Sequence, residues 1–91
     1  MTIEYSDVFL KSTKKLTDKI AVKRLKELIV KLENAVSLNE IPNVVTVKGN
    51  VGIYRIRTGD YRLIVEYWNG DVTILLLEYL KRDDNTYKNY N

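Results

Sequence analysis

The chain contains neither cysteine nor histidine. The absence of cysteine excludes disulfides, thiol nucleophiles and zinc-thiolate sites, and the absence of histidine removes the commonest metal ligand and general base. Glu66 and Glu78 are isolated carboxylates that form no metal-like cluster in the sequence, so we expect no metal and no other cofactor. Any catalysis must then use carboxylates, lysine, arginine, tyrosine or hydroxyl groups.

Long hydrophobic runs are also absent. The first 20 residues contain Glu4, Asp7 and several lysines, and no segment approaches the ~18 apolar residues of a membrane span. We therefore expect a cytoplasmic protein without membrane contact. With 91 residues and 45% hydrophobic content, the chain is predicted to form one domain over residues 1–91, because this is enough for one core but not two.

The positive charges are distributed unevenly along a chain of net charge +3. Seven of the ten lysines fall in the first third: Lys11, Lys14, Lys15, Lys19, Lys23, Lys26 and Lys31. Four of the five arginines follow residue 50: Arg55, Arg57, Arg62 and Arg82. Lysines on a helix usually form a solvated face, whereas arginine on a strand more often faces a ligand, because its planar fork matches phosphate geometry.

The first half of the chain has helical spacing. Thr2–Tyr5 is predicted to form a short strand, and Ser6 to cap a helix that begins at Asp7 and carries Val8, Phe9 and Leu16. A second helix is predicted from one apolar stripe: Ala21, Leu25, Leu28, Ile29, Leu32 and Val36. The two helices are expected to join near Thr17-Asp18. The Ser37–Glu40 segment has capping-box spacing for one more turn, which Pro42 limits.

After Pro42 the pattern becomes strand-like. The predicted strands are Val44 to Lys48, Val51 to Arg57, Tyr61 to Trp68 and Val72 to Leu80. Asn69-Gly70 predicts a type I′ hairpin between the last two. The fold class that follows is α+β, with two antiparallel N-terminal helices packed on one face of a mainly antiparallel, twisted sheet of four to five strands.

The segment Tyr54-Arg55-Ile56-Arg57 is the most informative for function. Because side chains alternate along a strand, Arg55 and Arg57 share one face, and a reversal through Gly59-Asp60 brings Arg62 almost opposite Arg57. Like charges directly across a strand pair are destabilising, so this cluster indicates an anionic partner, with phosphate as the leading candidate. The alternative is that Arg55 and Arg57 are solvent-facing residues paired with Glu66 or Asp60.

The aromatic residues around these arginines favour packing. Tyr54, Tyr61 and Tyr67 alternate with the arginines, which indicates packing rather than base stacking, and Trp68 is predicted to be a packing lid. The tail brings further cations and tyrosines. If it folds back over the open face of the sheet, Arg82 and Tyr87 can reach the arginine cluster; otherwise it is a disordered polar terminus.

These residues carry a resemblance to a known family. Three segments together resemble the RelE branch of the RelE/ParE toxin superfamily. They are Val47-Lys48-Gly49, the run from Tyr54 to Ile64, and a hydrophobic strand that ends in Lys81-Arg82 and is followed by Tyr87 five residues later. The resemblance implies a RelE-like fold and the toxin of a type II toxin-antitoxin pair. It implies a ribosome-dependent endoribonuclease that cleaves messenger RNA, with a RelB-like antitoxin, ribosome-bound message and ribosomal RNA as partners.

The resemblance also implies roles for individual residues in metal-independent RNA cleavage. Arg62 would stabilise the phosphorane-like transition state, and Arg82 would contact the scissile phosphate or assist the leaving group. Arg55 and Arg57 would hold and polarise the phosphate and ribose, and Tyr87 would orient the 2′-hydroxyl or stack on a base. The tail alignment also allows Tyr90 in place of Tyr87. The remaining RNA-binding cations would be Lys48, Lys81 and Lys88.

The chain departs from the family pattern in one respect. Family members often carry lysine at the two basic strand positions, whereas this chain has Arg55 and Arg57, and arginine is a poor proton acceptor. The general base is left open among Tyr87, Glu66, Glu78 and no dedicated base. Two other function classes stay open beside the endoribonuclease: a ParE-like toxin that poisons a DNA topoisomerase, and a non-catalytic binding module or inactive toxin.

Overall fold

In its described part, the chain begins with one short strand, continues with two α-helices and ends with four strands. The computed structural model describes residues 1–68 and 70–82. The elements are β1 (Thr2–Tyr5), α1 (Asp7–Lys14), α2 (Lys19–Asn34), the 3-10 turn η1 (Leu38–Glu40), β2 (Val44–Thr46), β3 (Ile53–Thr58), β4 (Tyr61–Glu66) and β5 (Thr73–Lys81). None of the helices among these residues is long and apolar enough to cross a membrane.

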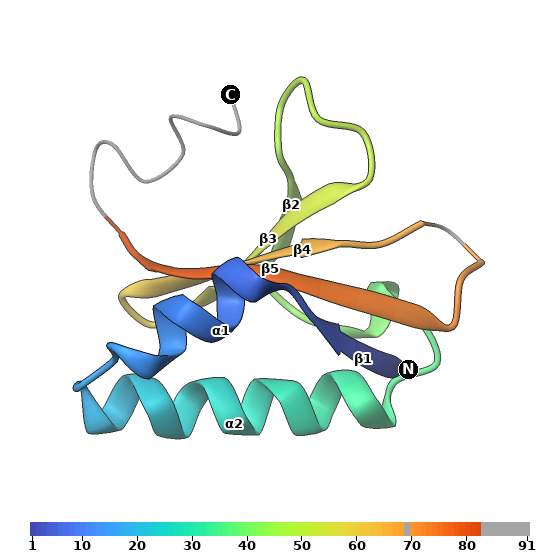
Figure 1. Cartoon of the computed structure of the whole chain (residues 1–91). Helices are drawn as coiled ribbons and strands as arrows, with labels where there is room; N and C mark the ends of the chain where they lie inside the picture. The colour runs from blue at the N-terminus through green and yellow to red at the C-terminus, as the bar shows by residue number, and fades with distance from the viewer. Residues whose placement is uncertain (69, 83–91) are drawn as a thin grey trace.

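The strands form one five-stranded sheet in the order β1-β5-β4-β3-β2. Strands β2 to β5 make an antiparallel meander, and β1 pairs in parallel with β5. Figure 1 shows both helices on the same side of this sheet. The predicted α+β class is confirmed, and the parallel pair is its one deviation from an antiparallel sheet.

An N-cap residue fixes the start of each helix, and the sequence predicts the first of these caps, Ser6. Ser6 Oγ accepts a hydrogen bond from Phe9 N at 3.0 Å and donates to Leu77 O at 2.7 Å, which ties the start of α1 to β5. Asp18 Oδ1 accepts from the backbone N–H groups of Ile20 and Ala21, so α2 begins where the sequence predicts.

The predicted end of the second helix is wrong. The helix ends at Asn34, and Val36, predicted to lie on its apolar stripe, is 82% exposed. The cause is a local competitor for the backbone: the Glu40 carboxylate accepts from Val36 N at 2.7 Å and Ser37 N at 3.1 Å and draws the chain into η1. Val8 in α1 is likewise exposed rather than part of the core.

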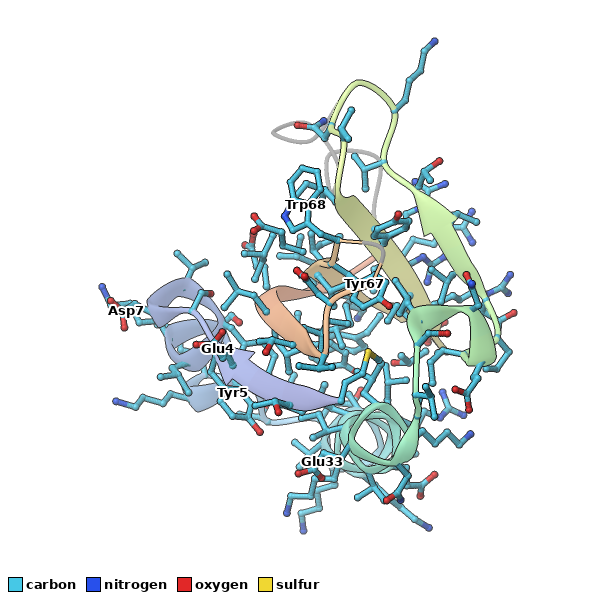
Figure 2. All side chains as sticks on the ribbon, turned by 90° about the vertical axis from the view of Figure 1, so that its right-hand side faces the viewer. Glu4, Tyr5, Asp7, Glu33, Tyr67 and Trp68 are labelled. Carbon is cyan, nitrogen blue, oxygen red and sulfur yellow. The ribbon has the colours of Figure 1, made fainter. Side chains whose placement is uncertain are left out.

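The core lies between the helices and the sheet and includes Phe9, Leu32, Leu63 and Leu76. Figure 2 shows Tyr67 close to η1 and Trp68 further out, near the loop between β2 and β3.

The tyrosine prediction is confirmed. Tyr54 meets Tyr67 edge-on at 6.5 Å between ring centroids, and Tyr61 stacks on Tyr79 at 4.9 Å. The ring of Trp68 packs on Gly52, where a Cβ would approach it to 2.8 Å.

The strands are shifted by up to two residues from their predicted bounds. β2 ends at Thr46 rather than Lys48, because Val47 N bonds Ile53 O and Asn50 N bonds Val47 O, forming a tight loop. In the predicted Asn69-Gly70 turn, Gly70 has φ of 91°, and Asn69 lies outside the described residues.

Candidate anion site on the open face of the sheet

Three arginines from two neighbouring strands lie on the sheet face that the helices leave open. Arg57 pairs directly with Arg62, and Arg55 pairs with Ile64. The intervening residues, such as Ile56 and Leu63, belong to the core on the helix side. Alternation along the strands then places all three guanidinium groups on the opposite face, as the sequence predicts.

A hollow of about 240 Å³ joins these side chains. It is lined by Asn43, Val45, Arg55, Arg57 and Arg62. Val45 of β2 lies opposite Arg55, and Asn43 O accepts from Arg57 N at 3.2 Å. Asn43 has φ of 64°, in the left-handed region that asparagine tolerates better than most residues, and this conformation turns the chain into β2. The volume and the convergent guanidinium groups fit a phosphate group.

Arg62 is the most constrained member of the hollow. It is 7% exposed, and its Nη1 donates to Tyr61 O at 2.9 Å and Gly59 O at 3.2 Å. The β3–β4 turn therefore orients the guanidinium. Both acceptors are neutral carbonyls, so neither contact neutralises the positive charge of the guanidinium.

Arg57 and Arg55 differ in their surroundings. Arg57 is exposed, and within residues 1–68 and 70–82 its guanidinium has no hydrogen-bond or ion-pair partner, so the alternative of pairing with Asp60 or Glu66 does not apply to it there. Arg55 is half-buried and does make an interaction. Arg57 is thus the cation most available to a ligand.

Among the described residues, the other predicted site residues do not line this hollow. Arg82 is exposed. Its backbone N–H donates a hydrogen bond to Asp60 O at 2.7 Å, beside the turn that orients Arg62. Lys81 lies opposite Tyr61 in the register, which places it on the helix side. Lys48 is exposed in the β2–β3 loop and does not line the hollow. Tyr87, Lys88 and Tyr90 lie outside the described residues.

The two candidate carboxylates, Glu66 and Glu78, lie at different positions on the same face of the sheet. Glu78 pairs with Ile64, which pairs with Arg55, so one row of the sheet runs from Arg55 to Glu78. Glu66 is four residues from Arg62, about 13 Å along the strand, and accepts from Trp68 Nε1 at 3.4 Å. By register Glu78 is therefore closer to Arg62 than Glu66 is, whereas Glu66, whose partner Ile53 is two residues from Arg55, is no farther from Arg55 than Glu78. No three acidic side chains in the described part of the chain gather as a metal site.

Two residues that contact the β3–β4 turn, Tyr79 and Arg24, could not be identified from the sequence pattern. The Tyr79 hydroxyl donates to Ala21 O at 3.1 Å, so in its 2.9 Å contact with Thr58 Oγ1 it must be the acceptor. Burial raises the pKa of Tyr79. Arg24 of α2 lies directly against Gly59, where a Cβ would overlap its guanidinium. Both contacts bring the helix against the turn that orients Arg62.

Comparison with known proteins agrees with this architecture. Residues 3–85 match the family model described as the ParE toxin of the type II toxin-antitoxin system parDE. Toxin RelE3 of Methanocaldococcus jannaschii is 36% identical over 75 residues, which cover 81% of this chain and 83% of that relative.

Solved structures agree as well. The RelB-RelE antitoxin-toxin complex from Methanococcus jannaschii has 32% identity and a TM-score of 0.75, and the match covers 97% of this chain and 99% of that one. The archaeal RelE-RelB complex from Pyrococcus horikoshii OT3 has 26% identity and a TM-score of 0.69, over 91% of this chain and 96% of that one.

The fold, the arginines on the open face of the sheet and these matches together define a class of protein. This class is the small α+β toxins of type II toxin-antitoxin systems. The chain belongs to the RelE/ParE superfamily of these toxins. Its similarity to RelE proteins of known sequence and structure corresponds to the RelE branch, although the matching family model carries the ParE description.

Proposed function

We propose that this toxin is a ribosome-dependent endoribonuclease that cleaves messenger RNA without a metal ion. The observation that carries the proposal is the hollow in which Arg55, Arg57 and Arg62 converge. A site built from three guanidinium groups on one open sheet face suits the backbone of RNA, because each guanidinium can bond two phosphate oxygens at once.

The proposed chemistry uses the RNA's own ribose. The 2′-oxygen attacks the adjacent phosphorus, the bond from phosphorus to the 5′-oxygen breaks, and a 2′,3′-cyclic phosphate is left. One proton must leave the 2′-hydroxyl and one must reach the departing 5′-oxygen. Arg62, held by the turn carbonyls, would stabilise the additional negative charge of the transition state. Arg82, beside the same turn, would contact the scissile phosphate or assist the leaving group.

Arg55 and Arg57 would hold the phosphate and ribose, but arginine is protonated throughout the physiological range and cannot act as the base. Glu78 shares a row of the sheet with Arg55 and is closer by register to Arg62 than Glu66 is, so it is the first carboxylate to test in that role. The rate of RNA cleavage by the Glu78→Gln variant tests whether Glu78 is the general base. A fall of at least tenfold in the rate of the chemical step supports a Glu78 base, and an unchanged rate leaves Glu66, Tyr87 or no dedicated base.

The partner that we propose is an antitoxin. Two similar structures are complexes of RelE with RelB, and this chain has a groove of about 500 Å³, with both apolar and polar lining, that can take a peptide segment. Its lining includes Leu38, Ile41, Val44, Tyr54 and Tyr67, on the helix side of the sheet. A segment of antitoxin would occupy this groove, with apolar side chains against Leu38 and Ile41 and hydrogen bonds to Asn39 and Thr46.

A second candidate function is favoured by one observation, the ParE description of the matching family model. A ParE-like toxin would poison a DNA topoisomerase and need no RNA chemistry.

Two assays with the purified toxin separate the candidates: message integrity in a purified cell-free translation system, and supercoiling of plasmid DNA by gyrase. Message cleavage with normal supercoiling supports the endoribonuclease. Intact message with arrested supercoiling identifies the ParE-like activity instead.

A further inference from the structure

A second pocket adjoins the arginine hollow around the edge of β3. It has a volume of about 240 Å³ and lies between α2 and the segment leading into β2. Asn43 and Arg57 line both cavities. The pairing of β2 with β3 stops at Ile56, so Arg57 stands at the rim of the sheet, between the open face and the helix side. A chain bound in the hollow can therefore pass this rim into the second pocket.

The pocket has an excess of positive charge. α2 contributes Arg24, Glu27 and Lys31, whose spacing of three and four residues places them on one helix face, and β3 contributes Arg57. Three cations and one carboxylate leave a net charge of +2. All four side chains are exposed, and none has a hydrogen-bond or ion-pair partner in the described part of the chain. Such cations keep their full capacity to bind an anion.

The shape of the pocket adds a second property. Between the cations it is lined by the core residues Leu28, Ile41 and Ile56. An apolar floor under a cationic rim suits a nucleotide, whose base or sugar can lie on the floor while its phosphate meets the rim. Gly59 contributes to this arrangement, because its missing Cβ makes room for the Arg24 guanidinium at the turn.

We propose that RNA bound in the arginine hollow continues around Arg57 into this pocket, where Arg24 and Lys31 bind a phosphate next to the scissile one. The inference rests on the proposed function and extends its substrate site. RNA is favoured over an acidic protein segment because the pocket is continuous with the hollow through two shared residues. Arg24 and Lys31 then act in substrate binding and leave the chemical step unchanged.

The test uses single-turnover cleavage on purified ribosomes programmed with a defined message. Arg24→Ala and Lys31→Ala should each raise the half-saturating toxin concentration by about three- to tenfold and leave the maximal rate within twofold. Lys26→Ala is the matched control, because it removes the same charge from an exposed position of α2 that does not line the pocket. It should stay within twofold of wild type, and Glu27→Gln should bind as tightly or more tightly.

The source of the phosphate is resolved by chemical substitution in the message. Replacing one phosphate beside the scissile one by a neutral methylphosphonate should weaken wild type but not Arg24→Ala, because the two changes remove the same contact. If no such substitution is coupled to Arg24 and Lys31, the phosphate belongs to ribosomal RNA and the proposed path is overturned. The path is also overturned if both variants behave like Lys26→Ala, or weaken only the binding of an antitoxin.

A second measurement distinguishes failure of the proposed endoribonuclease function from failure of the proposed RNA pocket. If the wild type cleaves no message, the same variants are compared for binding of a fluorescein-labelled RNA tetranucleotide by anisotropy. Weaker binding by Arg24→Ala and Lys31→Ala than by Lys26→Ala supports the pocket as an RNA site without cleavage. Equal affinities, or no binding by the wild type, overturn it.

Discussion

At the scale of single residues, the arginines and the groups around them divide into those that meet a ligand and those that hold the framework. Arg57 is exposed and without a partner among the described residues, whereas Arg62 is buried and oriented by two carbonyls. Tyr79 belongs to the framework, since its hydroxyl links Ala21 of α2 to Thr58 of β3. Its contribution is to stability and to the position of the turn.

Tyr79→Phe tests this framework role. The variant should unfold about 1 kcal/mol more easily at pH 7, because a buried hydroxyl with two hydrogen bonds is lost. Denaturant unfolding measures the difference, with the exposed Tyr5→Phe as a control expected to change stability by less than about 0.5 kcal/mol. Equal stability of Tyr79→Phe and wild type would show that the bridge contributes nothing.

The same pair of proteins gives a pH prediction. Burial raises the pKa of Tyr79 in the folded state, so the folded protein holds the phenolic proton more tightly than the unfolded chain does. The resulting stability is complete below the unfolded pKa of about 10 and is lost as the pH rises through the folded pKa. The advantage of wild type over Tyr79→Phe should therefore shrink between pH 9 and pH 11. An advantage that grows over this range would contradict the assignment.

At the scale of elements, the β3–β4 turn connects the helices to the candidate site. Arg24 lies against Gly59, Tyr79 holds Thr58, and the carbonyls of Gly59 and Tyr61 orient Arg62. Gly59 has φ of 63°, where a side chain is disfavoured, and a Cβ there would meet Arg24 as well. The turn thus sets the position of a cation on each side of the sheet.

Gly59→Ala and Gly49→Ala separate backbone strain from this contact. Both glycines have positive φ, so each variant should lose about 1–2 kcal/mol of stability in denaturant unfolding. Only Gly59→Ala displaces Arg24, because nothing lies within 4 Å of a Cβ at Gly49. Gly59→Ala alone should therefore raise the half-saturating toxin concentration, and adding Arg24→Ala to it should raise that concentration no further. Additive effects would show that Arg24 acts independently of the turn.

Local rules made much of this arrangement predictable from the sequence. Strand alternation and the Gly59-Asp60 turn place Arg55, Arg57 and Arg62 together. The Ser6 cap sets the start of α1, and α2 begins just after the predicted Thr17-Asp18 junction. The contacts of Arg24 and Tyr79 were not predictable, because they depend on how α2 docks on the sheet, and an arginine among lysines on a helix carries no signal of that docking. The exposure of Val36 was missed because the Glu40 carboxylate overrides the helical period.

At the scale of the whole molecule, the two sides of the sheet have different tasks. The helices and the core occupy one side, and the arginine hollow occupies the other, with Arg57 at the rim between them. The proposed RNA path passes this rim, while the groove that we assign to an antitoxin lies on the helix side, beside η1 and β2. An antitoxin bound in that groove would lie close to the RNA path, which gives a physical route to inhibition.

The most direct test of the central claim is primer extension on a message translated in a purified cell-free system with wild type, Arg62→Ala or the control Lys26→Ala. The account predicts cleavage within codons only when ribosomes are present, a loss on the order of 10²- to 10³-fold in rate for Arg62→Ala, and near-normal cleavage by Lys26→Ala. Thermal unfolding of each variant checks that it is folded. An intact message with wild type, or equal cleavage by a folded Arg62→Ala, would contradict the claim that the arginine hollow cleaves RNA.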